Sequence, residues 1–84
     1  MEPLERFALH YLADEQFCST AELILFVQLQ LGCGADTSTA MVAELLAAWD
    51  ARGWTGATSE DHAAHIYLLD QAFHDLPWLT ARPN

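Results

Sequence analysis

The sequence has almost no positive charge. Its 84 residues include no lysine, and three arginines (Arg6, Arg52 and Arg82) stand against twelve aspartates and glutamates, for a formal net charge of −9. Charged residues make up 18% of the chain, below the roughly 25% of an average protein, so the imbalance comes from missing cations rather than surplus acids. This depletion repels nucleic acids and anionic membranes and favours a partner with a basic surface.

Long hydrophobic runs and targeting signals are also missing. The longest apolar run, LILFV at residues 23–27, is far short of the roughly 18 residues that cross a membrane. No basic segment precedes the early acids of the N-terminus, so we expect no signal peptide and a cytoplasmic protein. Cys18 and Cys33 are then expected to be reduced thiols. With 52% hydrophobic residues, the chain is expected to fold as a single domain over residues 1–84.

Motifs for catalysis are absent from the sequence. It contains no nucleophile elbow, dinucleotide fingerprint or phosphate loop, so we expect neither an enzyme nor a cofactor. The histidines His62 and His65 form the one grouping that suggests a metal, since Asp61/His65 and Asp70/His74 would each lie one turn apart on a helix. Paired cysteines are missing, so we predict no metal site and keep a metal-binding protein only as a third alternative.

The first part of the chain has the apolar spacing of a helix. This helix is predicted to begin near Pro3, a residue suited to a first helical position. Its expected buried face comprises Leu4, Phe7, Ala8, Tyr11 and Leu12. Phe17 and Cys18 are expected to follow as a short strand or an extended link.

A second helix is predicted from the capping box STAE at residues 19–22, and Gly32 is a natural end for it. The alternation of VQLQL at residues 27–31 keeps a strand as the competing interpretation. The expected inner face comprises Leu23, Ile24, Val27 and Leu31. Leu25, Phe26 and Leu29 make the element apolar nearly all round, so it is either central or exposes a hydrophobic face.

A third helix is predicted over residues 39–52, after a glycine-rich connection at residues 32–39. Its expected inner face comprises Val42, Leu45, Leu46 and Trp49. Gly53 is predicted to end this helix, and the apolar Trp54 is predicted to fold back on the helix end.

The stretch DARGWTGATSEDHAAHIYLLD, residues 50–70, has two interpretations. Its glycines and turn formers between candidate strands predict a β-hairpin wing, followed by a short helix over residues 71–76. Ser59 as an N-cap and Pro77 as a stop predict instead a helix over residues 59–76. The fold class is therefore mainly α, with a three-helix helix-turn-helix core and a small β wing, or alternatively a four-helix all-α domain.

The order of these features over residues 4–70 resembles that of bacterial winged helix-turn-helix domains, in which a third helix ending in Gly-Trp passes into the wing. The resemblance implies that the third helix would meet the DNA major groove. Its exposed residues would be Thr37, Ser38, Thr39, Ala40, Ala43, Glu44 and Ala47. None of these commonly reads base edges, and three scattered arginines cannot supply the phosphate contacts. We therefore do not expect direct DNA binding.

Size, acidity and the lack of active-site motifs resemble small acidic phage inhibitors such as anti-CRISPR proteins. This resemblance implies a non-catalytic inhibitor that docks on a basic surface of a nucleic-acid-handling protein. The residues predicted to bind the partner are Glu44, Asp50, Glu60, Asp61, Asp70, Asp75 and Trp78, although Trp78 could also fold onto the domain. The alternative is a dimeric winged-helix regulator or adaptor, in which the apolar second helix, or the first helix together with the C-terminal tail, forms a homodimer.

Overall fold

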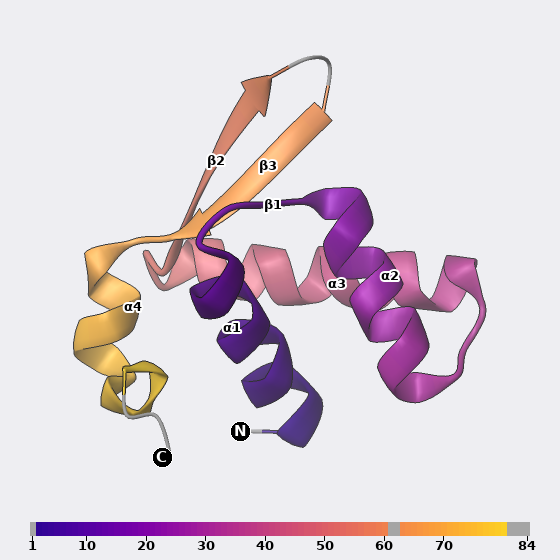
Figure 1. Cartoon of the computed structure of the whole chain (residues 1–84), viewed down its shortest axis with the longest axis horizontal. Helices are drawn as coiled ribbons and strands as arrows, with labels where there is room; N and C mark the ends of the chain where they lie inside the picture. Colours follow the sequence, from indigo (N-terminus) through magenta and orange to yellow (C-terminus); the bar gives the residue numbers. More distant parts are fainter. Residues whose placement is uncertain (1, 61–62, 81–84) are drawn as a thin grey trace.

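The computed structural model describes residues 2–60 and 63–80 of the chain. These residues form α1 (Pro3–Glu15), β1 (Cys18–Ser19), α2 (Thr20–Leu31), α3 (Ala35–Ala51), β2 (Thr55–Glu60), β3 (Ala63–Leu68), α4 (Asp70–Asp75) and the 3₁₀ turn η1 (Pro77–Leu79). The helices gather into one body, from which the β2–β3 hairpin projects (Figure 1). The predicted helical core with a small β wing is confirmed. The four-helix alternative is wrong, because residues 63–68 are extended.

Helix α1 begins at Pro3, as predicted, and ends at Glu15, where Gln16 forms the C-cap with a φ of 65°. Its buried face differs from the predicted stripe. Phe7 is 56% exposed, whereas Leu9 is completely buried. The reason is that both α2 and β3 pack against α1, and they cover the side of the helix that holds Leu9 rather than the side that holds Phe7.

Helix α2 has the predicted caps at both ends. The Ser19 hydroxyl accepts a hydrogen bond from the backbone N–H of Glu22 at 3.1 Å, and Gly32 ends the helix with a left-handed φ of 63°. The competing strand over residues 27–31 is therefore wrong. Leu23 and Val27 are buried as expected, but Leu31, which was assigned to the inner face, is 47% exposed.

Helix α3 begins four residues earlier than predicted, at Ala35. The Gly34 carbonyl accepts from the Ser38 N–H at 3.0 Å, which closes a first turn inside the segment taken as a connection. Ser38 was predicted to be exposed and is completely buried. Its hydroxyl donates to the Ile24 carbonyl at 2.5 Å, because α2 and α3 pack against each other at this point.

The end of α3 directs the chain into the hairpin. Gly53, with a φ of 74°, donates its N–H to the Asp50 carbonyl, and the Trp54 N–H bonds to the Trp49 carbonyl, both at 3.0 Å. This pair of bonds is a Schellman motif, which requires the left-handed residue that glycine supplies most easily. Trp54 folds back as predicted and is only 3% exposed.

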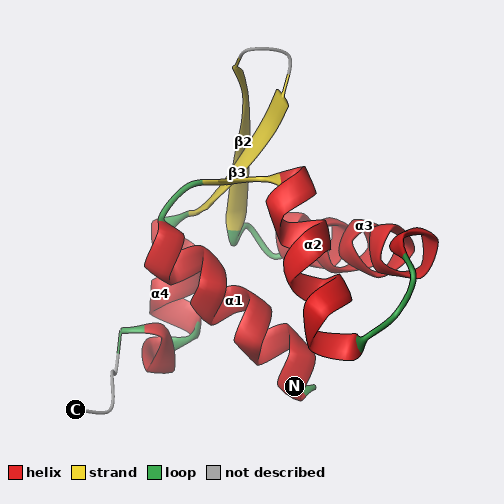
Figure 2. Cartoon of the chain, turned by 45° about the vertical axis from the view of Figure 1, so that its right-hand side comes forward, coloured by secondary structure: helices red, strands yellow, loops and turns green. Residues whose placement is uncertain are grey.

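The sheet has three antiparallel strands in the order β1-β3-β2, with β3 in the centre. The hairpin extends away from the helices in a second view as well (Figure 2). Ile66 is buried toward the core, whereas Tyr67 points to the opposite face, where it pairs with Gly56. A Cβ at Gly56 would lie 2.6 Å from the Tyr67 ring, so the ring rests directly on the glycine.

The C-terminal elements fold back onto the body of the domain. Helix α4 matches the short final helix predicted over residues 71–76, shifted by one residue. The Leu69 N–H bonds to the Trp54 carbonyl at 2.8 Å, which ties the end of β3 to the start of β2. The buried core draws on almost every element and comprises Ala8, Leu9, Leu12, Cys18, Leu23, Val27, Val42, Trp49, Trp54, Ile66, Ala72, Leu76 and Leu79.

Candidate interaction surfaces

Both arginines in the described part of the chain lie against tryptophans of the same domain. The Arg6 guanidinium is 5.1 Å from the centroid of the Trp78 ring, and the Arg52 guanidinium is 4.9 Å from that of Trp54. These are cation–π distances. His10 also contacts Trp78, with ring centroids 5.0 Å apart. Both arginines remain exposed to solvent beside these rings. The contacts with Arg6 and His10 place Trp78 against α1.

The residues predicted to bind a partner are spread over several parts of the molecule. Glu44 and Asp50 are exposed on α3, but they line different grooves. Asp70 is exposed in the first turn of α4. Glu60 ends β2, and Asp61 lies outside the described residues.

Asp75 has partners inside the domain. The Trp54 indole N–H donates to Asp75 Oδ2 at 2.8 Å, and the Gln71 side-chain amide donates to Oδ1 at the same distance. The bond from Trp54 is the main reason why the pKa of Asp75 lies below its ordinary value. Since both oxygens already accept bonds, Asp75 holds the end of α3 to α4 and has less capacity for a partner than Glu44 or Asp50.

The stretch of α3 that was expected to face DNA in a winged helix, residues 37–47, contains no arginine or lysine. A groove of about 290 Å³ separates α3 from the hairpin, and we call it the hairpin groove. It is lined by Leu46, Ala47, Asp50, Thr55, Gly56, Ala57 and Ile66. Its one charged lining residue is a carboxylate, which would repel phosphate.

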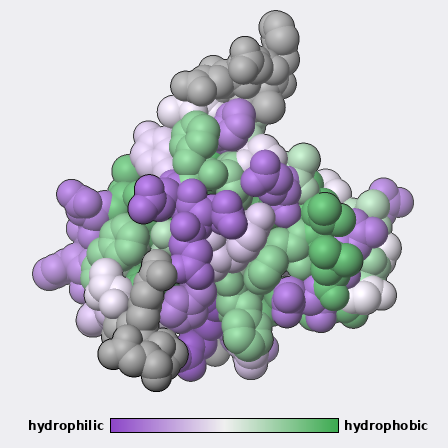
Figure 3. Space-filling model, in the orientation of Figure 1, coloured by the Kyte–Doolittle hydropathy of each residue, from purple (hydrophilic) through white to green (hydrophobic). Residues whose placement is uncertain are grey.

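Helix α2 carries an exposed apolar face. Leu25 is 54% exposed and Leu29, one turn later, is 73% exposed. In the space-filling view, hydrophobic side chains gather over the position of α2 (Figure 3). Phe26 does not belong to this face, because it is half-buried and stacks on Tyr11 with ring centroids 4.5 Å apart. Large exposed leucines on one face are typical of an interaction surface.

A second groove lies between the start of α1, the end of α2 and one side of α3, and we call it the α1–α3 groove. Its volume is about 520 Å³. It is lined by Glu2, Leu4, Glu5, Leu31, Met41, Glu44, Leu45, Ala48 and Arg52. The position of Glu5 is fixed, because Glu5 Oε1 accepts a hydrogen bond from the Trp49 indole at 3.0 Å. This groove combines an apolar floor with three carboxylates.

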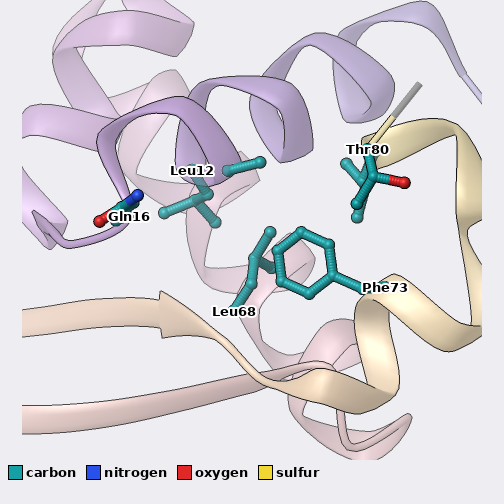
Figure 4. A pocket seen from close by; sticks show the side chains of 7 residues that line it. Leu12, Gln16, Leu68, Phe73 and Thr80 are labelled. Carbon is teal, nitrogen blue, oxygen red and sulfur yellow. The ribbon is translucent and has the colours of Figure 1, made fainter. Parts of the chain in front are cut away.

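A pocket of about 430 Å³ lies where the end of α1 meets β3, α4 and η1 (Figure 4). Leu12, Leu68 and Phe73 converge on it, and the polar side chains of Gln16 and Thr80 lie at its edge. The remaining lining residues are Ala13 and Leu79. None of these described lining residues is an acid or a base, and Thr80 supplies the one hydroxyl group.

Neither cysteine shows the features of a reactive thiol pair. Cys18 and Cys33 are both free, and Cys18 is buried. Burial, assisted by the nearby carboxylates of Glu22 and Glu15, raises the pKa of Cys18 to about 11. At neutral pH this thiol is protonated and therefore a poor nucleophile.

Of the two helical pairs that suggested a metal, Asp70/His74 has the predicted spacing and the pair that includes His65 does not. His65 lies in β3 and stacks on Phe17, with ring centroids 4.7 Å apart, so the Asp61/His65 pair has no helical spacing. Asp70 and His74 do share α4. His62 lies outside the described residues. Within residues 2–60 and 63–80, no three side chains of the metal-binding types come together.

The α1–α3 groove was missed from the sequence, although part of it has a readable signal. Helix α3 carries a second stripe at helical spacing beside its inner face, made of Met41, Leu45, Ala48 and Arg52. This stripe is the part of α3 that lines the groove. The contributions of Glu2 and Leu4 depend on how α1 crosses α3. No local pattern records that crossing.

Comparison with known proteins gives no match, whether with family models, curated proteins or solved structures. No helix in the described part of the chain is both long and apolar enough to cross a membrane.

Proposed function

We propose that the protein is a non-catalytic binding module that docks a carboxylate-bearing, partly apolar surface on a basic partner protein. The observation that carries this proposal is the distribution of charge. The described residues hold two arginines, Arg6 and Arg52, which are exposed and each lie over a tryptophan ring. Exposed carboxylates, among them Glu44, Asp50 and Asp70, outnumber them. A partner therefore meets an outward surface of predominantly one sign, and such surfaces steer association with oppositely charged proteins.

Proteins that handle nucleic acids are the partner class that fits best, because they present lysines and arginines to phosphates. The module would occupy such a surface and act as an inhibitor, in the manner of small acidic phage proteins. Direct binding to DNA is not part of the proposal. The hairpin groove beside α3 is lined by one carboxylate and no cation, and residues 37–47 of α3 carry no arginine or lysine.

The experiment is affinity capture of partners from bacterial lysate, followed by elution in a salt gradient. We expect a nucleic-acid-handling protein to elute at moderate salt, because the attraction is electrostatic and is screened by ions. Duplex DNA added to the column should compete for the captured protein. The double variant Glu44→Gln/Asp50→Asn should lose capture, while Glu15→Gln/Asp36→Asn, with the same change in net charge, should retain it. Equal retention by both variants would refute the assignment of these carboxylates.

A second candidate function is a regulator or adaptor that dimerises through α2. The exposed leucines Leu25 and Leu29 favour it, and residues 23–35 carry no charge at all. Two chains of net charge −9 would repel each other least across such a face. Sedimentation equilibrium at low and high salt distinguishes the adaptor from the acidic inhibitor. Salt at about 0.05 M leaves a Debye length of about 14 Å, whereas salt at about 1 M shortens it to about 3 Å and screens charge–charge attraction. A dimer that persists at high salt and is lost in Leu25→Gln/Leu29→Gln would favour the adaptor.

A further inference from the structure

The α1–α3 groove is the concave surface that best combines the two features of a protein-binding site. Its floor is apolar, formed by Leu4, Leu31, Met41 and Leu45. Leu31 is 47% exposed, so the floor is open to a partner. Three carboxylates and one guanidinium line the same groove. An apolar centre with a charged margin is the usual composition of a specific interface.

The charge of the groove selects a basic occupant. Glu2 and Glu44 are both exposed at its margin, on α1 and α3 respectively. Glu5 is half-buried and held by the Trp49 indole, so its negative charge is fixed in place at the wall. Arg52, the one cation among the lining residues, lies over the Trp54 ring. The lining is therefore net negative, and opposite charge on the ligand is required for complementarity.

The architecture of the groove selects a helical occupant. All its lining residues come from helices α1, α2 and α3 or their caps, and no sheet edge borders it. An extended peptide would find no strand with which to pair its backbone, whereas a helix satisfies its own N–H and C=O groups. Along α3, the lining runs from Met41 to Arg52, which corresponds to roughly 16 Å at 1.5 Å per residue. A partner helix of about three turns matches this length.

We propose that the α1–α3 groove binds an amphipathic helix of a partner protein, with apolar residues on the groove floor and lysines or arginines beside Glu2 and Glu44. This inference rests on the proposed function and deepens it, since it assigns the docking surface and the form of the partner. Glu44 belongs both to the acidic surface of the proposed function and to the proposed helix-binding groove. Asp50 and the hairpin groove lie outside the proposed contact.

The test uses synthetic helical peptides of about 18 residues, long enough to populate a helix in water. The first carries leucines at i, i+3, i+4 and i+7 with lysines on the flanks. The second replaces the lysines by glutamates, and the third has the composition of the first in a scrambled order. Binding to the ¹⁵N-labelled full chain is measured by calorimetry and by backbone amide chemical shifts. Only the first peptide is expected to bind, with shifts at α3 residues lining the groove, at Leu31 and at the start of α1.

Two pairs of variants localise the contact. Glu44→Lys is expected to weaken binding about tenfold, whereas Glu15→Lys, with the same charge change on another exposed helical position, weakens it about twofold or less. Leu31→Gln is expected to weaken binding, and Leu29→Gln, which lies on the exposed face of α2 outside the groove, is not. All four positions are exposed, and matching thermal melts establish that the variants are folded.

Each other outcome overturns the inference in a distinguishable way. Equal binding of the scrambled peptide would mean that charge alone attracts it. Shifts centred on Asp50 and the hairpin would refute the α1–α3 groove but leave the proposed acidic module intact. No binding of the lysine peptide at low salt would also refute the groove. The partner capture with Glu44→Gln/Asp50→Asn would then decide the proposed function independently.

Discussion

Replacing Gly56 by alanine tests how the outer face of the hairpin is packed. The added Cβ would lie 2.6 Å from the nearest atom of the Tyr67 ring, well inside van der Waals contact. The clash involves the far end of a half-buried ring that can rotate away. We therefore expect a cost at the low end of overpacking penalties, about 1 kcal/mol. For a domain of this size, that cost lowers Tm by about 4–8 °C.

The effect should change sign when the ring is removed. Gly56 does not have a positive φ, so alanine fits its backbone conformation. In a Tyr67→Ala background, Gly56→Ala should then stabilise the protein by about 0.4–1 kcal/mol, because alanine restricts the unfolded chain more than glycine does. The coupling free energy between the two positions should accordingly be about 1.5–2 kcal/mol.

The assay is a double-mutant cycle by urea denaturation, followed by far-ultraviolet circular dichroism, with thermal melts as a second readout. The four proteins are the parent, each single variant and the double variant. If Gly56→Ala destabilised the protein equally with and without the Tyr67 ring, then the glycine would be required by backbone geometry or by another neighbour. The reasoning from the ring contact would be refuted.

Three further predictions concern side chains whose partners the structure identifies. Ser38→Ala should lower the free energy of unfolding by about 1 kcal/mol, because it removes a buried hydrogen bond; an unchanged urea midpoint would contradict this. Burial raises the pKa of Cys18 from its ordinary value of 9.0 to about 11. Below pH 9 the thiol is neutral in both states; as the pH rises from 9 toward 11 only the unfolded chain ionises readily, so the fold loses stability on the order of 2 kcal/mol. Cys18→Ala should show a shallower alkaline loss of stability, measured by denaturation at pH 8, 9.5 and 11 (roughly spanning the two pKa values). Asp75 has a lowered pKa, so its contribution is present above its ordinary value of 3.8 and lost as the pH falls below that value. Asp75→Asn should therefore be less stable than the parent at pH 7, with the difference shrinking in acid; a difference independent of pH would contradict the bond from Trp54.

The local signals in the sequence predicted most of the fold. Caps and glycines are short-range features, so the capping of α2 by Ser19 and the Gly53 turn could be read directly. The choice between a wing and a fourth helix could not. Residues 63–69 satisfy both periodicities tolerably, and pairing with β1 and β2 settled the matter in favour of a strand. That pairing brings together segments far apart in the chain.

The errors have the same origin in tertiary contacts. Ser38 is polar and lies in a glycine-rich region, which predicted an exposed residue, but its hydroxyl meets the Ile24 carbonyl of the neighbouring helix. Phe7 and Leu9 exchanged their expected environments because the position of α2 and β3 around α1 is not encoded in apolar spacing. The predicted binding residues were chosen by charge and chain position. They consequently include Asp75, which the fold already uses to hold Trp54.

The two-residue strand β1 has a consequence for the order of folding. Its register joins Cys18 to Ile66 across most of the sequence, whereas the β2–β3 hairpin closes a short loop. Closing a long loop costs more chain entropy and yields here only a two-residue ladder. The hairpin and the helices should therefore form before β1 joins the sheet, and β1 should be among the first segments to open. Since Cys18 lies in this strand and is buried in the folded protein, its reaction with thiol reagents should report a local opening of β1 that global unfolding probes would miss.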